Sequence, residues 1–197
     1  MGDYESSLER DVMELFQFDL NVESFLAQPL TIKFHDKTGK SCSYTPDGLV
    51  QFKPQAGGHF CPILYEVKFR ADFRENWKTL MPKFRAAKNF CLDRNWRFEV
   101  YTEREVRTPY LNNVKFLWPF RNRPISEAQA TQILTVLADL EEADPDFLLC
   151  ALCRTLDERA RLIPAIWYLV SIGAIGCDLA VPLTMRSRFW PTREISS

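Results

Sequence analysis

Apolar and polar positions follow two different periods along this chain, and each period predicts a different kind of element. Near the start, Leu8, Val12, Leu15 and Phe16 recur at helical spacing behind serines that can cap a helix, which predicts a helix over residues 7–18. Most later apolar runs are short, rich in aliphatic and aromatic residues, and bounded by turn residues, as is typical of strands. They predict strands over residues 30–35, 41–44, 49–52, 63–69, 97–101 and 114–118, and a strand or loop over 22–25.

Helical patterns are interleaved with these strands. A long helix is predicted over residues 72–94, where Pro82 should start or kink the second half because proline cannot donate the helical hydrogen bond. A short helix is predicted near residues 103–107. Strands in the middle with helices around them are typical of an α/β fold with a mixed central sheet flanked by helices. We assign this pattern to a first domain over residues 1–120.

The pattern changes character after residue 120. Three helices are predicted, over residues 126–140, 144–156 and 159–172, and a short run then leads into residues 177–181. Three helices and a small hairpin resemble a winged-helix module, which would form a small α-rich domain over residues 121–182. A winged helix normally offers its third helix to DNA. That helix carries few cations here, so a protein-docking surface is favoured over independent DNA reading.

The remaining residues, 183–197, are predicted to form a tail. Phe189 and Trp190 stand between arginines in this segment. Buried aromatic and arginine side chains contribute much of the binding energy at protein interfaces. We therefore expect Phe189 and Trp190 to anchor the tail on a partner protein.

The candidate chemistry lies in the first domain, in Pro46-Asp47 and in Glu66-Val67-Lys68. Side chains alternate across a strand, so Glu66 and Lys68 share one face, while Asp47 stands at the start of the preceding strand. Two adjacent antiparallel strands would bring Asp47 beside Glu66. Mg²⁺ needs only one or two carboxylates from a protein, and it polarises phosphate and acidifies bound water. The motif therefore predicts a metal-dependent phosphodiester hydrolase in which Lys68 orients the water or offsets charge.

A third carboxylate comes from the first helix. Glu9 shares its flank with Met13 and Phe16 and is expected to lean toward the apolar stripe, where it could complete the metal site. The alternative is an acid that only stabilises the helix start. Glu5 lies one helical turn away and is a second candidate for the third acid. Glu5, Asp11 and Glu14 are expected to be more solvent-facing than Glu9.

Charge is unevenly distributed, although the whole chain has a net charge of only −1. Residues 68–123 carry fourteen basic and six acidic side chains, a net charge of +8. Cations clustered beside an acidic metal site are expected of a protein that binds the phosphate backbone of DNA. For any single cation, a solvated helix face is the alternative. The candidate DNA-binding residues are Arg74, Lys78, Arg85 and Lys88, which would form one stripe on the long helix, and Arg70, which precedes it.

Several segments, in order, resemble TnsA, the endonuclease subunit of heteromeric transposases in cut-and-paste bacterial transposons, including CRISPR-associated ones. The resemblance covers most of the chain. Some family members have glutamine at the position of Glu66, where glutamate is commoner across the wider PD-(D/E)xK nucleases. The segments are Leu8-Glu9-Arg10-Asp11, Phe18-Asp19, Val22, Phe25, Gln28-Pro29-Leu30, Tyr44-Thr45-Pro46-Asp47, Tyr65-Glu66-Val67-Lys68 and Thr102-Glu103.

The resemblance implies a restriction-endonuclease-like core in the first domain, with Glu9, Asp47, Glu66 and Lys68 in the places of the nuclease residues. It also implies Mg²⁺ as cofactor, with Mn²⁺ able to substitute, and double-stranded DNA at transposon ends as substrate. The enzyme would cut the 5′ strands while the TnsB recombinase cuts and joins the 3′ ends. The C-terminal part would engage the TnsC ATPase regulator.

Two other functions remain open at this stage. One is a restriction, repair or Holliday-junction nuclease of the same superfamily. The other is a non-catalytic architectural subunit whose acids only shape a fold. All three assignments place the protein on DNA in the bacterial cytoplasm, with no small-molecule substrate. No apolar run approaches the length of a membrane span, so no membrane association is expected.

Overall fold

A computed structural model describes residues 3–36, 38–54 and 61–192 of the chain. The chain divides into two compact units, Met1–Arg107 and Thr108–Ser197, which we describe separately. In the described ranges, no helix is both long enough and apolar enough to span a bilayer.

The first unit is built on a four-stranded mixed sheet. The strands lie in the order β1 (Val22–Ala27), β4 (Gly48–Phe52), β5 (Ile63–Val67) and β6 (Arg97–Tyr101). β4 pairs antiparallel with both β1 and β5, whereas β5 and β6 run parallel because the long helix α2 (Arg70–Leu92) connects them. The predicted mixed sheet is confirmed, and the segment left open at residues 22–25 is a strand.

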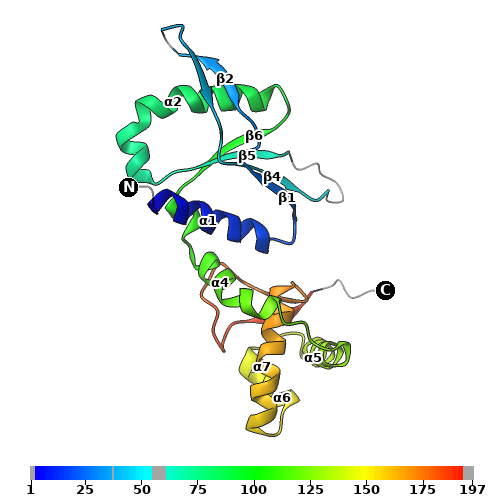
Figure 1. Cartoon of the computed structure of the whole chain (residues 1–197). Coiled ribbons are helices and arrows are strands. Elements are labelled where there is room, and N and C mark those ends of the chain that lie inside the picture. Colours follow the sequence, from blue (N-terminus) through cyan, green and yellow to red (C-terminus); the bar gives the residue numbers. More distant parts are fainter. Residues whose placement is uncertain (1–2, 37, 55–60, 193–197) are drawn as a thin grey trace. The chain divides into compact units, whose positions relative to one another are not determined.

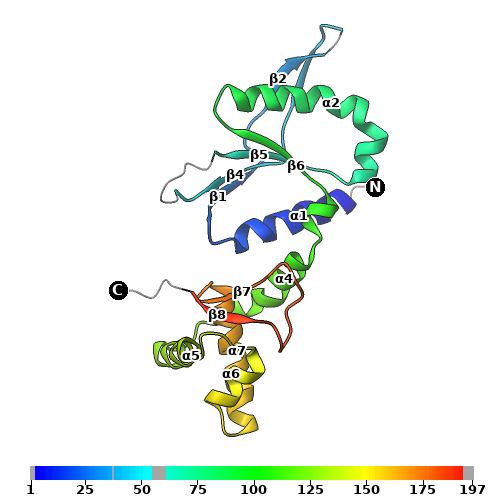
Figure 2. The same cartoon turned by 180° about the vertical axis from the view of Figure 1, so that it is seen from behind.

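Helices cover the two faces of this sheet (Figures 1 and 2). On one face, α1 (Asp3–Phe18) packs Phe16 against Tyr65 and Tyr101, with ring centroids 5.2 Å and 5.9 Å apart. On the other face, the second half of α2 buries Ala87 and Cys91 against the sheet. Every residue of β5 is buried because helices cover both of its faces.

A separate hairpin, β2 (Ile32–His35) with β3 (Ser41–Tyr44), extends the α2 side of the core. Its Ile32 and Tyr44 are buried in the same cluster as Leu49 and Leu64 of the sheet. Tyr44 is the last residue of β3, so its position in this cluster sets where the following Pro46-Asp47 segment enters the sheet.

α2 remains a single helix through Pro82, and its direction changes along its length (Figure 1). Proline removes one helical hydrogen bond and crowds the preceding turn, so a bend at this residue is expected. A short helix, α3 (Glu103–Val106), follows β6 and starts with a capping box between Thr102 and Glu105. The predicted short helix is confirmed, and Pro82 lies inside α2, which bends along its length.

Asp11 corrects one prediction made from the helical pattern. It is only 6% exposed, and its Oδ2 atom accepts a hydrogen bond from Arg107 Nε at 3.0 Å. The periodicity of α1 alone placed Asp11 toward solvent. A partner 96 positions away in sequence makes its burial possible, because a buried carboxylate needs a paired charge.

The second unit is mainly helical. It contains α4 (Pro109–Arg121), α5 (Glu127–Leu140), α6 (Pro145–Leu152) and α7 (Leu156–Ser171), then strands β7 (Ile175–Cys177) and β8 (Phe189–Pro191). The two strands pair antiparallel, and Ala143 makes an isolated bridge to Phe189. Thr155 and Ser126 close capping boxes at the starts of α7 and α5.

The strand predicted over residues 114–118 is wrong, because this segment lies inside α4. Its aromatic and aliphatic residues have high strand propensity. However, Leu111, Val114 and Leu117 are buried at a spacing of three, which places them on one helical face, and Pro109 begins the helix. This helix belongs to the second unit, not to the first domain in which it was predicted.

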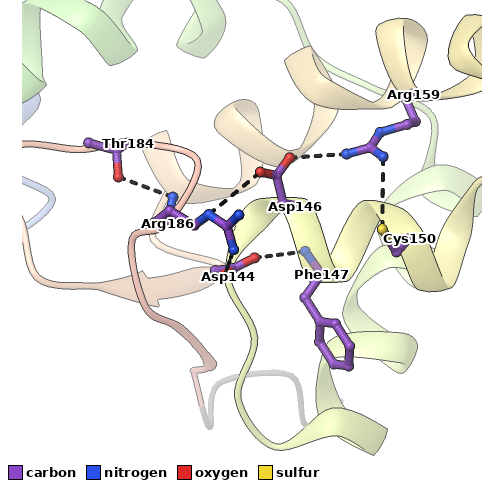
Figure 3. Close-up of polar contacts among 7 residues, drawn as sticks. All are labelled: Asp144, Asp146, Phe147, Cys150, Arg159, Thr184 and Arg186. Carbon is purple, nitrogen blue, oxygen red and sulfur yellow. Dashed lines mark hydrogen bonds and ion pairs between the residues drawn. The ribbon is translucent and has the colours of Figure 1, made fainter.

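Polar contacts hold the segment between β7 and β8 onto the start of α6 (Figure 3). Arg186 lies 3.5 Å from Asp144 and 3.9 Å from Asp146, and Asp146 is also 3.0 Å from Arg159 of α7. Asp144 caps α6 by accepting a hydrogen bond from the Phe147 backbone N–H. In this network, which we call the Arg186 network, every acid is matched by an arginine or a helix N-terminus.

Candidate active site

Asp47 is held at the entrance to β4 by contacts of its main chain and its side chain. Its carbonyl oxygen accepts a hydrogen bond from Gln28 N at 2.9 Å, and its Oδ2 atom accepts one from Val67 N at 2.7 Å. The next residue, Gly48, lies against Tyr65 so closely that a Cβ atom would overlap the tyrosine ring. The glycine therefore lets β4 start directly beside β5, which fixes the carboxylate of Asp47 at the end of β5.

Glu66 is almost completely buried, with 4% of its surface exposed. Its Oε2 atom accepts a hydrogen bond from the Tyr44 hydroxyl at 2.5 Å, and its Oε1 atom lies 3.6 Å from Lys68 Nζ. Lys68 lies just past the end of β5, and its side chain is 15% exposed. The strand alternation thus places acid and ammonium on one face, as predicted.

Glu66 is a buried acid whose charged form is disfavoured by its surroundings. Burial, and then the negative charge of Asp47, raise the pKa of Glu66 to about 7. The hydrogen bond from Tyr44 and the positive charges of Lys68 and Lys83 act in the opposite direction. A buried carboxylate and a half-buried one that repel each other are suitable ligands for a cation.

Glu9 lies near the other side of β5. It is half-buried on α1, and its negative charge acts on Tyr65, whose pKa is raised to about 12 by burial, by Asp47 and by Glu9. Within the part of the chain that the structure describes, no three His, Cys, Asp or Glu side chains form a metal-binding group. The structure therefore brings Asp47, Glu66 and Lys68 together, but it does not gather Glu9 with the two acids into a cluster of three. The side chain of Glu5 lies outside the described residues.

The donor chemistry of the pair fits a hard divalent cation. Carboxylate oxygens are the ligands that Mg²⁺ and Mn²⁺ prefer, and one or two of them are sufficient for Mg²⁺. Asp47 and Glu66 are the residues that would hold such an ion. The buried position of Glu66 beside Asp47 supports this fit, because a bound cation would offset the repulsion that raises the pKa of Glu66.

Sequence reasoning missed two residues of the site. Tyr44 stands in the Tyr44-Thr45-Pro46-Asp47 motif, but its bond to Glu66 depends on the packing of the hairpin on the sheet. Lys83 belongs to the basic block, and its helix position next to Pro82 gave no signal that its charge acts on Glu66. The position of Tyr44 directly before Pro-Asp is the one sequence signal that could have indicated its role.

The predicted DNA-binding residues are all exposed on α2. Four of them, Arg70, Arg74, Arg85 and Lys88, line a groove between α2 and the end of β6. Lys78 is not part of that lining, and its ammonium lies 5.8 Å from the centroid of the Trp77 ring. The basic residues are therefore divided between a groove and the open helix surface.

Phe189 corrects the predicted partner anchor. It is fully buried in β8, where its ring packs edge-on against Trp167 at a centroid distance of 5.7 Å. The pairing of β8 with β7 explains this burial, because alternate residues of a strand face opposite sides. Trp190 is 39% exposed, so only this half of the predicted pair offers surface to a partner.

Comparison with known protein families gives a match in the first unit. Residues 19–103 match the family described as "TnsA-like endonuclease N terminal". The matched range includes Asp47, Glu66 and Lys68, and it ends before the second unit begins. No curated protein matches the chain.

Proposed function

We propose that this chain, in which residues 19–103 match a TnsA-like endonuclease domain, is the Mg²⁺-dependent subunit that cleaves the 5′, non-transferred strand at transposon ends. The observation that carries this proposal is the meeting of buried Glu66, Asp47 and Lys68 at the end of β5. In this assignment the protein acts on double-stranded DNA in the bacterial cytoplasm, and Mn²⁺ can replace Mg²⁺.

Each side chain of the site has a separate task. Asp47 and Glu66 hold the ion, and they are themselves held by the Val67 N–H and the Tyr44 hydroxyl. When bound, the ion supplies positive charge at the phosphate and a more acidic water. Lys68 directs its ammonium toward the same place, where it orients the attacking water and offsets the charge that develops on the phosphate.

The position of Glu9 favours an indirect role. It is not proposed as a ligand of the ion that Asp47 and Glu66 hold. Its charge acts on Tyr65, next to Asp47, from the α1 side of the sheet. We assign Glu9 to shaping the field around Asp47 or to a second ion at that side.

The second unit is proposed to bind proteins of the transposase. The order of α5, the Ala143 bridge, α6, α7 and the β7–β8 hairpin supports a winged-helix-like module. Its exposed apolar side chains include Phe147 and Trp190, which support docking of a protein such as the TnsC regulator. In this assignment, the TnsB recombinase cuts the 3′ ends beside the first unit.

Strand-specific cleavage of labelled transposon ends tests the proposed function. The wild-type chain, assembled with the recombinase and Mg²⁺, is expected to nick only the 5′ strand. Lys68→Ala should lower that rate by about 10²-fold or more, since one stabilising cation in the transition state has about this effect. Lys40→Ala, a change at an exposed lysine of the β2–β3 hairpin, is the matched control and should keep the wild-type rate.

The assembly itself serves as the check on folding. Lys68→Ala should enter the complex with the recombinase as the wild type does, because Lys68 lies at the end of a strand whose core contacts are made by other residues. Undiminished 5′ nicking by Lys68→Ala in the assembled complex would remove Lys68 from the mechanism and would favour a non-catalytic subunit.

A further inference from the structure

The groove between α2 and β6 has an apolar floor and a cationic rim. Its volume is about 740 Å³, within the range of pockets that hold drug-sized ligands. Phe73, Phe84 and Phe98 form a row of rings along it, with successive centroids 6.1 Å and 5.5 Å apart. Trp77 lies in the same lining and is 48% exposed. Phe84 itself is buried, so the aromatic surface that the groove presents comes from exposed Trp77 and from half-buried Phe73 and Phe98.

The charges around this groove are almost all positive. Arg70, Arg74, Arg85 and Lys88 line it, and the acid in the lining, Glu105, is already engaged with Thr102 in the capping box of α3. The pKa of Glu105 is lowered, chiefly by its hydrogen bond from the Thr102 side chain. This acid is therefore ionised, and its carboxylate already has a hydrogen-bond partner at the start of α3. A ligand of the groove must therefore be anionic and must also have flat apolar surface.

The groove adjoins the candidate active site on the same face of the sheet. Val100 of β6 lines the groove and pairs directly with Glu66 of β5 in the parallel register. Arg70 follows Lys68 by two positions, and its backbone N–H donates to Glu103 Oε2 at 2.9 Å, which ties the start of α2 to the segment after β6. A polymer that presents a phosphodiester to Lys68 can continue from there into the groove.

We propose that this groove binds an unpaired DNA strand next to the cleavage site, with bases on the aromatic floor and phosphates on the four cations. The inference rests on the proposed nuclease function and adds to it that the strand is locally unpaired when it is cut. Single-stranded nucleic acid is bound by this combination of aromatic platforms and a cationic path. In a duplex, the base faces are already stacked on each other and cannot reach Phe73 or Trp77.

The same groove chemistry could receive an acidic, aromatic peptide from a partner protein. The continuity of the groove with Glu66 and Lys68 favours DNA, because the substrate of those residues is itself a phosphodiester chain. The peptide is therefore the competing outcome of the test below.

Binding of fluorescein-labelled oligothymidine to the full-length chain tests this inference. Binding is measured by fluorescence anisotropy in the presence of a chelator that removes divalent cations, so the proposed metal-dependent cleavage does not occur. Trp77→Ala should weaken binding by about tenfold, the effect of losing one base-stacking ring, whereas Trp77→Phe should retain most of it. Leu92→Ala removes an even more exposed apolar side chain from the same helix outside the groove, and it should bind as the wild type does.

A second pair of variants separates the groove from general charge attraction. Arg74→Ala should weaken binding of oligothymidine more than Lys78→Ala, because Arg74 lines the groove and Lys78 does not. The same chain should bind oligothymidine more tightly than a blunt duplex of equal length, and the preference should disappear in Trp77→Ala. Circular dichroism checks that each variant keeps its helical fold.

Two results would overturn the inference. The first is equal binding of oligothymidine by Trp77→Ala and Leu92→Ala. The second is Trp77-dependent binding of a glutamate- and phenylalanine-rich peptide, with no Trp77-dependent binding of oligothymidine. The binding test and the nicking test are independent, because binding is measured without cleavage. Failure of the groove proposal would leave the nicking result for Lys68→Ala unchanged. Failure of the nuclease proposal would likewise leave the measured oligothymidine binding unchanged.

Discussion

Two acidic clusters of this protein use carboxylates in opposite ways. In the first unit, half-buried Asp47 lies close to buried Glu66, and their repulsion contributes to raising the pKa of Glu66 to about 7. In the second unit, Asp144 and Asp146 are matched by Arg186, Arg159 and the start of α6 (Figure 3). The first arrangement costs stability and suits a bound cation, whereas the second holds a loop in place.

The two clusters differ in exposure as well as in charge balance. The side chain of Glu66 is 5% exposed, while the side chain of Arg186 in the other network is 80% exposed. Charge pairs near water contribute little to stability, and buried charges that are not fully offset cost much. In this protein, the carboxylates without a full set of positive partners therefore form the candidate site, and the fully paired ones hold a loop.

Loss of either carboxylate of the first cluster should have the largest effect. Asp47→Asn and Glu66→Gln should each lower the 5′ nicking rate by about 10³-fold, because each removes a charged ligand of the proposed ion. Asp146→Asn, the matched change in the second unit, should stay within about twofold of the wild type, since its tasks are structural. Nicking rates of labelled ends in the assembled transposase measure all three. Equal loss from Asp146→Asn would end the distinction between the clusters.

The Tyr44 hydroxyl should have the next largest effect. Tyr44→Phe keeps the ring in the core but removes the hydrogen bond to Glu66. We expect a loss of nicking of about tenfold, the effect of one hydrogen bond to a charged group. Tyr168→Phe, a half-buried tyrosine of α7, is the control and should nick normally. A higher Mg²⁺ requirement in Tyr44→Phe would show that the lost bond acts through the position of Glu66.

The free energy of unfolding should depend on pH through Glu66. It should fall as pH rises, whereas an acid stabilised by an ion pair makes it rise. The pKa of Glu66 is about 7 in the folded chain against 4.5 for the ordinary side chain, so the folded state binds more protons between these values. In chelator, the contribution of Glu66 to the free energy of unfolding is therefore largest at low pH and falls as pH rises from about 4.5 through 7.

Glu66→Gln removes this dependence, because glutamine does not ionise. The variant should be about 1–2 kcal/mol more stable than the wild type at pH 8, with little difference near pH 4.5. Urea unfolding at both pH values in chelator measures the change. A variant that is less stable than the wild type at pH 8 would show that Lys68, Lys83 and Tyr44 more than compensate the buried charge.

The Arg186 network should show the smallest effect. Arg186→Ala removes two ion pairs at 3.5 Å and 3.9 Å from a side chain that is largely in water. The free energy of unfolding should fall by less than about 1 kcal/mol, and the change should shrink in high salt. Urea unfolding at low and high salt tests this. A loss of several kcal/mol in the free energy of unfolding that does not change with salt would show that the Arg186 network behaves as a buried ion-pair network.

Local periodicity explains why part of the fold was predictable. The alternation in β5 predicted that Glu66 and Lys68 share a face, and the turn before β4 predicted that Asp47 would lie beside them. The helical spacing of Leu111, Val114 and Leu117 is equally present in the sequence, but this segment also has high strand propensity, and the strand predicted from that propensity is wrong. Strand propensity and helical periodicity predict different structures for residues 114–118, and the structure agrees with the periodicity.

By itself, the sequence determined which residues lie in helices and strands over most of the first unit, and it placed two acids and a lysine at adjacent strand ends. Neighbours a few positions apart decide such patterns, so they can be read along the chain. Only the tertiary structure decided the burial of Glu66, its contacts with Tyr44 and Lys83, the pairing of Asp11 with Arg107, and the enclosure of Phe189. Those properties depend on residues that are brought together by packing across long stretches of sequence, and no local pattern specifies them.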